Sequence, residues 1–433
     1  MLIIKNGRVM DPASGLDGLY DILIDGETIA KIGMCGSLSD MAAESALMSS
    51  ESLTEIDASG CVVAPGLVDA HVHFRDPGFT DKEDIGTGAE AAKAGGFTSV
   101  VMMGNTSPHM DNPDTIRYAL EKGASTGIHV YTCGNVTKGM EGKELTDMEE
   151  LLSCGAVLFT DDGKPITDEK IMRRACEESK RLGVVLSLHE EDPSYITDNG
   201  VNAGDAADAL GLTGSPRDAE IAMVQRDIAI ANETGAHITI QHISTKEAVE
   251  MIRKARQTNK RIHAEATPHH FTLTDSAVAE YGTLAKMNPP LRKEEDRLAI
   301  IEGLGDGTIE TIATDHAPHT KTEKQKPFRE APSGITGLET SLGLGIRELV
   351  QPGYLSLMEL LSRMTIQPSL IYGLDAGRIA EGGIADLVIF NLNEDRKIDT
   401  FASKADNSPF KGQTIPGRVK FTISSGRVVY RAE

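Results

Sequence analysis

The chain has 433 residues, of which 40% are hydrophobic and 25% charged, an ordinary composition for an enzyme with one large and one small domain. Its formal net charge of −22 opposes binding to nucleic-acid phosphates, and no apolar run reaches the ~18 residues of a membrane span. The five cysteines form no CxxC pair, and the apolar run at the N-terminus is too short for a signal peptide. We therefore expect a cytoplasmic protein that binds neither nucleic acid nor membrane and acts on a small molecule.

The two ends of the chain share one sequence pattern. Residues 1–60 and 372–433 contain short alternating strands separated by turns rich in Asn, Asp and Gly, such as YDILIDGETIAKIG and GRVKFTISSGRVVY. This pattern is typical of antiparallel β structure. We predict that both ends build one small β-sandwich domain, and that residues 61–371 form a second domain inserted between them.

Eight apolar strands alternate with helix-length segments in the middle of the chain. The expected strands are CVVAPGLVDAHVHF, FTSVVMMGN, GIHVYTCGN, AVLFTDD, VVLSLHEE, HITIQHIST, RIHAEATPHH and TIETIATDHAP. Helical segments such as 167–182 and 215–234 lie between them. Eight such units predict an α/β fold, a (β/α)8 TIM barrel, whose active site lies at the C-terminal ends of the strands.

Residues that commonly bind metals recur at these strand ends. The first strand ends in HVHFR, and because side chains alternate along a strand, His71 and His73 point the same way. The fifth, sixth and eighth strands end at His189, His242 and Asp315. Each of these residues alone is more often structural. Together, four strands that aim such residues at one barrel mouth predict two adjacent metal ions, which would hold a hydroxide and polarise a carbonyl.

The fourth strand ends in FTDDG and offers a carboxylate to bridge two ions. Alternation places Asp161 on the same face as Phe159, which suits the interface between barrel and helices. This favours Asp162 as the inward residue. The alternative is that one of the two aspartates only braces the loop.

Longer motifs resemble known families. DAHVHFRDPG, LHEED, QHIST and ATDHAPH resemble the amidohydrolase superfamily, and NTSP, GNVTKGMEGKELTDM, KMNPPLR and APSGITGLET resemble the class I dihydroorotases. The resemblance covers essentially the whole chain and implies a zinc-dependent cyclic-amide hydrolase. Its reaction would be the reversible cyclisation of N-carbamoyl-L-aspartate to dihydroorotate, the third step of de novo pyrimidine (UMP) synthesis.

The resemblance also implies two Zn²⁺ ions per subunit with a hydroxide bridging them. The implied ligands are His71, His73, Asp162, His189, His242 and Asp315. Asp315 is in addition the implied catalytic proton carrier. The resemblance further implies a homodimer and leaves open an association with a transcarbamoylase.

The substrate carries a carboxylate, which a planar guanidinium binds through two hydrogen bonds. Arg75 lies two residues beyond His73 on the same side of an extended chain. The resemblance assigns the carboxylate to Arg75, Asn105 and His319. The alternatives are a surface salt bridge for Arg75, a turn cap for Asn105 and a solvent-exposed His319.

Three further residues are assigned to the substrate by the resemblance. Asn288 would contact the ring, although an Asn-Pro turn is the alternative. Ser333 and Gly334 would offer backbone contacts. Ser333 stands where other members carry Phe, so we expect no role for its side chain. The polar segment 319–337 follows the eighth strand and is predicted to be a lid, the alternative being a surface run with solvated lysines.

Other functions fit the sequence less well. Hydantoinases, dihydropyrimidinases and allantoinases bridge their metals with a carboxylated lysine, and this chain has TDDG at that place. A metal-free scaffold that only supports a transcarbamoylase would have lost ligands, whereas all six are present. A zinc-storage protein would not explain Arg75 and Asn105 beside the metal residues.

Overall fold

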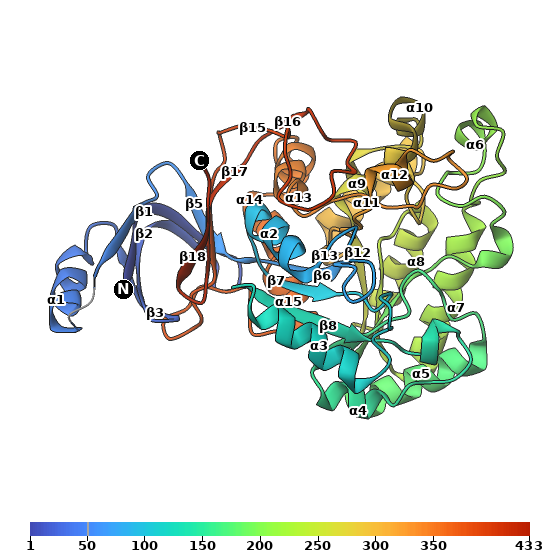
Figure 1. Ribbon diagram of the computed structural model, residues 1–433, viewed down its shortest axis with the longest axis horizontal. Helices are drawn as coiled ribbons and strands as arrows, with labels where there is room; N and C mark the ends of the chain where they lie inside the picture. The colour runs from blue at the N-terminus through green and yellow to red at the C-terminus, as the bar shows by residue number, and fades with distance from the viewer. Residues whose placement is uncertain (50–51) are drawn as a thin grey trace.

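The computed structural model describes residues 1–49 and 52–433, and it places a β sheet built from both chain ends beside a barrel (Figure 1). The strand order in the terminal sheet is β18-β17-β14-β5-β1-β2-β3, with β4 paired to β1. Its strands are β1 (Leu2–Asp11), β2 (Leu16–Asp25), β3 (Thr28–Met34), β4 (Thr54–Asp57), β5 (Val62–Pro65), β14 (Leu387–Asn391), β17 (Arg418–Ser424) and β18 (Arg427–Arg431). The prediction that the two chain ends share one β unit is confirmed. Its boundaries at residues 60 and 372 stay a prediction.

The first predicted barrel strand is in fact two strands. β5 pairs with β1 and β14 in the terminal sheet, and only β6 (Leu67–Val72) belongs to the barrel. Gly66 separates them, and a Cβ at this position would lie 2.1 Å from Oγ1 of Thr98. The two strands are buried throughout, so the apolar run looked continuous in the sequence.

The barrel strands follow one another in chain order, and every neighbouring pair is parallel. They are β6, β7 (Phe97–Met102), β8 (His129–Gly134), β9 (Ala156–Phe159), β10 (Val185–Leu188), β11 (His237–Ile240), β12 (Ile262–Ala266) and β13 (Thr311–Ile312). A parallel bridge between Val72 and His316 joins the first strand to the segment after the last. The predicted TIM barrel is confirmed.

Helices connect the strands and cover the barrel (Figure 1). The main ones are α2 (Ile85–Gly95), α3 (Pro113–Ala124), α4 (Met148–Ser153), α5 (Glu169–Leu182), α7 (Asp218–Thr234), α8 (Lys246–Arg256), α11 (Glu294–Asp306), α14 (Leu357–Arg363) and α15 (Ile366–Tyr372). The N-cap of α5 is Asp168, whose side chain accepts from two backbone N–H groups, and its C-cap is Gly183 in the left-handed region. These two caps made the segment 167–182 recognisable as a helix. In the segment 215–234, α7 has only the C-terminal signal, Gly235 in the left-handed region, and no side-chain N-cap.

Further helices and two short strands lie outside this set. They are α1 (Ser39–Ser49), α6 (Asp205–Ala209), α9 (Pro268–Thr272), α10 (Ala277–Tyr281), α12 (Lys321–Lys324), α13 (Ser341–Gly345), β15 (Arg396–Lys397) and β16 (Thr414–Ile415). None of the described helices is long and apolar enough to cross a bilayer.

Alternation along the strands separates two apolar clusters. On β7, Val100 and Met102 pack in the large cluster that includes residues of the surrounding helices. Val101, together with Met103 just after the strand, belongs to a second cluster with Leu158 and Val185 of neighbouring strands. The second cluster therefore fills the barrel interior, and the polar strand ends lie beyond it.

Candidate metal centre and substrate pocket

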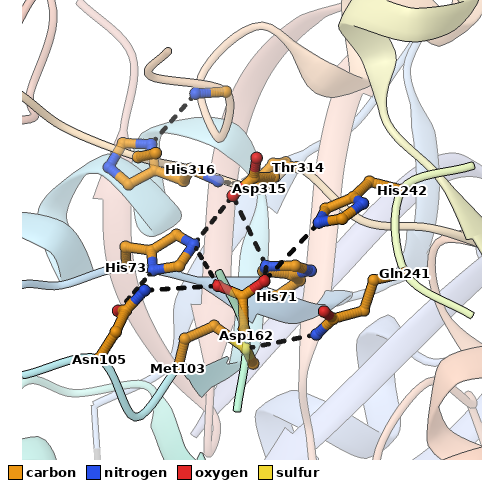
Figure 2. Close-up of polar contacts among 12 residues, drawn as sticks. His71, His73, Met103, Asn105, Asp162, Gln241, His242, Thr314, Asp315 and His316 are labelled. Atoms are coloured by element: carbon orange, nitrogen blue, oxygen red, sulfur yellow. Dashed lines mark hydrogen bonds and ion pairs between the residues drawn. The ribbon is translucent and has the colours of Figure 1, made fainter. Parts of the chain in front are cut away.

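The six predicted metal ligands come together at the C-terminal ends of the barrel strands. His71 lies in β6, His73 just after it, Asp162 after β9, His189 after β10, His242 after β11 and Asp315 after β13. All six side chains are buried. Figure 2 shows Asp162 among the side chains of His71, His73 and His242.

Asp162 lies at a spacing from four imidazoles that suits shared metal ions. Its carboxylate oxygens are 3.6 Å from Nε2 of His71, 3.4 Å from Nε2 of His73, 3.4 Å from Nδ1 of His189 and 3.7 Å from Nε2 of His242. Two ligands bound tetrahedrally at zinc, each about 2.05 Å from the ion, lie about 3.4 Å apart. The spacing is therefore that of ligands around common ions.

Asp315 completes the cluster from the segment after the last strand. Its Oδ1 is 2.9 Å from Nε2 of His73 and 3.6 Å from Nε2 of His71. Asp315 has φ +48° and His242 has φ +30°, in the left-handed region that non-glycine residues rarely adopt. Strained backbone of this kind is concentrated at functional sites.

The residues fit a metal. His71, Asp162 and His242 form one group whose ligand atoms all lie within 4.8 Å of one another, and His71, His73 and Asp315 form another. His71 is a member of both groups. Its Nε2 faces Asp162 and Asp315, and this atom has no hydrogen-bond partner among the described residues. A buried polar atom without a partner is costly, and a cation would satisfy it. Mixed imidazole and carboxylate donors are typical of zinc sites.

Asp162 stays ionised, as a metal ligand must. Burial alone would raise the pKa of its carboxyl group, but the charge of His71 and the close imidazole rings of His189, His242 and His71 outweigh burial. The pKa of Asp162 therefore lies well below its ordinary value. The neighbouring Asp161 plays a different part, since it accepts hydrogen bonds from the backbone N–H groups of Val136 and Thr137 and braces that loop.

One residue that supports the cluster was missed from the sequence. Glu265, fully buried on β12, lies 2.6 Å from Nδ1 of His71 and accepts a hydrogen bond from the backbone N–H of His242 at 3.3 Å. It fixes the ring of one predicted ligand and the backbone of another. A glutamate inside the predicted strand RIHAEATPHH was the available signal.

Two more residues contact the predicted ligands. Oδ1 of Asn105 is 2.9 Å from Nδ1 of His73, and its Nδ2 donates to Asp162 at 3.4 Å. Glu191 lies 3.3 Å from Nε2 of His189. The side chain of Asn105 is thus directed to the cluster, where it lines the pocket. Its contact with a substrate carboxylate stays a prediction.

A cavity of about 400 Å³ opens onto the cluster. All six residues assigned to the substrate line it, namely Arg75, Asn105, Asn288, His319, Ser333 and Gly334. The pocket therefore combines five of the six predicted metal ligands, all but His71, with every predicted substrate residue.

Arg75 is directed into this pocket, and the alternative of a surface salt bridge is wrong. Its Nε donates to the carbonyl of Pro318 at 3.3 Å, and Nη2 lies 3.3 Å from Nε2 of His319. No carboxylate of residues 1–49 or 52–433 lies within ion-pair distance of it, and burial lowers its pKa. His319 is only 6% exposed, so its solvent-exposed alternative is wrong as well. A guanidinium without a carboxylate partner is ready to bind one from a ligand.

Ser333 does have a role for its side chain, contrary to expectation. Its hydroxyl donates to Oδ1 of Asn288 at 3.0 Å, which leaves the amide N–H groups of Asn288 for the pocket. Its carbonyl lies 2.8 Å from Nε2 of His319.

Gly334 has φ +121°, and a Cβ there would approach that of Ala317 to 2.6 Å. This turn needs glycine for both reasons.

Two buried lysines stabilise the segment 319–337, Lys324 from within it and Lys286 from outside it. Nζ of Lys324 donates to the carbonyls of Pro332 and Gly334 at 2.9 and 3.1 Å. Nζ of Lys286 donates to the carbonyl of Phe328 at 2.8 Å. The alternative of solvated lysines is therefore wrong for Lys324, and the movement of this segment as a lid stays a prediction.

The chain is similar to several known proteins. Residues 62–429 match the amidohydrolase family. The dihydroorotase of Clostridioides difficile (strain 630) is 53% identical over 432 residues, covering 100% of both chains, and that of Lactococcus lactis subsp. lactis is 48% identical over 433 residues with the same coverage. Among solved structures, an L-hydantoinase (dihydropyrimidinase) from Arthrobacter aurescens superposes with a TM-score of 0.87 at 25% identity, covering 99% of this chain and 96% of that one.

Proposed function

This chain belongs to the amidohydrolase family and is a dihydroorotase of pyrimidine biosynthesis, and on this basis we propose how its pocket works. His71, His73, Asp162 and Asp315 would hold one Zn²⁺ ion, and Asp162, His189 and His242 would hold a second. The observation that carries this assignment is the metal-ligand spacing around Asp162 in the same cavity as the unpaired Arg75.

The chain's own residues position the substrate. Arg75 binds the carboxylate of dihydroorotate through its planar guanidinium, with Asn105 and His319 beside it. Asn288 presents its amide N–H groups to the ring, because Ser333 occupies its Oδ1. The backbone N–H of Ser333, which has no partner among the described residues, is free to donate to the ring as well. Together these contacts direct the ring amide toward the cluster.

Proton transfer falls to Asp315, which lines the pocket beside His73. Bound zinc would supply a nucleophilic oxygen from water at neutral pH and polarise the amide carbonyl. During hydrolysis the carbon–nitrogen bond of the ring breaks, and Asp315 carries the proton of the attacking water to the leaving nitrogen. In ring closure the ureido nitrogen forms the bond to the carboxyl carbon and gives its proton to Asp315. Asp315 passes this proton to the carboxyl oxygen, whose bond to carbon breaks, and with a second proton from solvent that oxygen leaves as water.

The test compares three cyclic amides on one preparation. Hydrolysis of dihydroorotate, hydantoin and allantoin is followed by absorbance, and zinc is measured on the same sample. We expect turnover of dihydroorotate alone, with two zinc ions per chain. Turnover of hydantoin without dihydroorotate, or full activity without bound metal, would contradict the proposal.

Assembly and location complete the proposal. We propose a homodimer, as the resemblance to the class I dihydroorotases implies, in the cytoplasm, where the free cysteines would stay reduced. Sedimentation of the purified protein, alone and with a transcarbamoylase from the same pathway, measures both the homodimer and any association between the two enzymes.

A further inference from the structure

A second arginine stands at the mouth of the pocket with its side chain in solvent. Arg329 lines the cavity above the cluster and also an adjoining cavity of about 430 Å³. Its side chain is 65% exposed, and its guanidinium donates to Asp198 through Nε at 2.7 Å and Nη2 at 3.2 Å. The pair joins the segment after α12 to the segment between β10 and α6.

The two partners of this ion pair are unequal. The side chain of Asp198 is 6% exposed and also accepts a hydrogen bond from the backbone N–H of Thr213 at 2.9 Å. Asp198 is therefore fixed, whereas the side chain of Arg329 rests on it from the solvent side. Because Thr213 also holds Asp198 and the guanidinium of Arg329 lies in solvent, Arg329 is the partner that a solute can reach.

The two segments also pack together without the ion pair. Gly200 has φ +79°, and a Cβ there would lie 2.5 Å from Cγ of Lys286 and 2.8 Å from Oγ of Ser333. Such close backbone packing holds the rim in place near Arg329. Loss of the ion pair would therefore leave the two segments packed together and the pocket wall intact.

The charge of the substrate and of the protein suggests a function for Arg329. The proposed function, on which this inference rests, requires an anionic substrate: dihydroorotate has one carboxylate and carbamoyl aspartate has two. The chain carries a formal charge of −22, and Glu330, which is not among the predicted metal ligands, lines the same cavity. Of the cations there, Lys286 is occupied by backbone carbonyls of the wall. Among the described residues that line the cavity, only Arg75, inside it, and Arg329, at its mouth, can offer a guanidinium to an incoming carboxylate.

We propose that Arg329 is a specificity-determining residue that attracts the anionic substrate at the mouth of the pocket, and that Asp198 restrains its charge until the substrate arrives. A cationic side chain at a pocket mouth raises the rate of capture of an anion, and salt weakens the effect. The substrate then passes to Arg75, and Arg329 returns to Asp198.

Two variants, one without the cation and one without the anion, distinguish substrate attraction from a purely structural tie, meaning an ion pair that only connects the two segments. Arg329→Gln removes the cation, and Asp198→Asn removes the anion that neutralises it. We expect kcat/KM for dihydroorotate at low ionic strength to fall about tenfold in Arg329→Gln and to rise severalfold in Asp198→Asn. If the pair were only a tie, both variants would break the same contact and change kcat/KM in the same direction, which would overturn the proposal.

Ionic strength supplies the second measurement. The salt dependence of kcat/KM should flatten in Arg329→Gln and steepen in Asp198→Asn, while Arg329→Lys should keep the wild-type dependence. Arg329→Glu changes only an exposed side chain, so it remains informative if Asp198→Asn fails to fold, and added salt should raise its kcat/KM. Unchanged salt dependence in Arg329→Glu would refute the role. Failure of the wild-type enzyme to turn over dihydroorotate would instead refute the proposed function.

Discussion

A substitution of Arg75 tests most directly whether this residue binds the substrate or only braces the metal centre. In Arg75→Gln the planar fork and its charge disappear, while the short polar side chain still fits the pocket. A hydrogen bond between a charged pair contributes about 1.5–3 kcal/mol, so a two-bonded carboxylate loses about 3–6 kcal/mol. At about 1.4 kcal/mol per factor of ten, kcat/KM should fall by roughly 10²–10⁴.

The same substitution should change the stability of the fold very little. The two contacts of Arg75 inside the protein, to the carbonyl of Pro318 and to His319, are both 3.3 Å long and are not charge-paired. Their loss should change the free energy of unfolding by no more than about 1 kcal/mol. Zinc content should stay at the wild-type level, because Arg75 contacts none of the predicted ligands.

The assay combines steady-state kinetics on dihydroorotate, zinc content and denaturant unfolding on the same preparations. Arg75→Lys is the matched control: it keeps the charge but not the planar fork, and should recover only part of the lost kcat/KM. Loss of zinc in Arg75→Gln, or destabilisation by about 3 kcal/mol or more, would show that Arg75 braces the site, and the reasoning would be refuted.

Three further predictions concern the supporting residues. Glu265→Gln should weaken zinc binding about 10–100-fold, measured by competition with a chelator, because an amide orients the ring of His71 less strongly than a carboxylate does; unchanged affinity would contradict this role. Asp162→Asn should lose zinc and activity, whereas Asp161→Asn should keep zinc and lose about 1–3 kcal/mol of stability, so equal zinc loss in both would count against the assignment. Burial lowers the pKa of Lys324 to about 7 from 10.5, so above pH 7 the unfolded chain binds more protons and stability rises with pH by up to about 1.4 kcal/mol per unit. Below pH 7 this contribution is constant, and Lys324→Met should remove the rise, as urea unfolding at pH 7, 8 and 9 would measure.

Local sequence patterns determined the barrel and the residues at its mouth. Eight apolar runs alternating with capped helices predict the fold because each strand and helix signal is complete within about ten residues. Alternation along a strand likewise placed His71 beside His73 and directed Asp162, rather than Asp161, to the cluster. These predictions needed only the direction of a side chain within its own element.

Contacts between distant elements were decided only by the tertiary structure. Glu265 meets His71 across 194 residues, and Arg329 meets Asp198 across 131. The burial of Lys324 and the hydrogen bond of the Ser333 hydroxyl also depend on segments that are remote in sequence or folded back on themselves. Spacing along a chain fixes which way a side chain points from its own strand or loop. Which partner it reaches is fixed by barrel closure, which brings the ends of all eight strands to one rim.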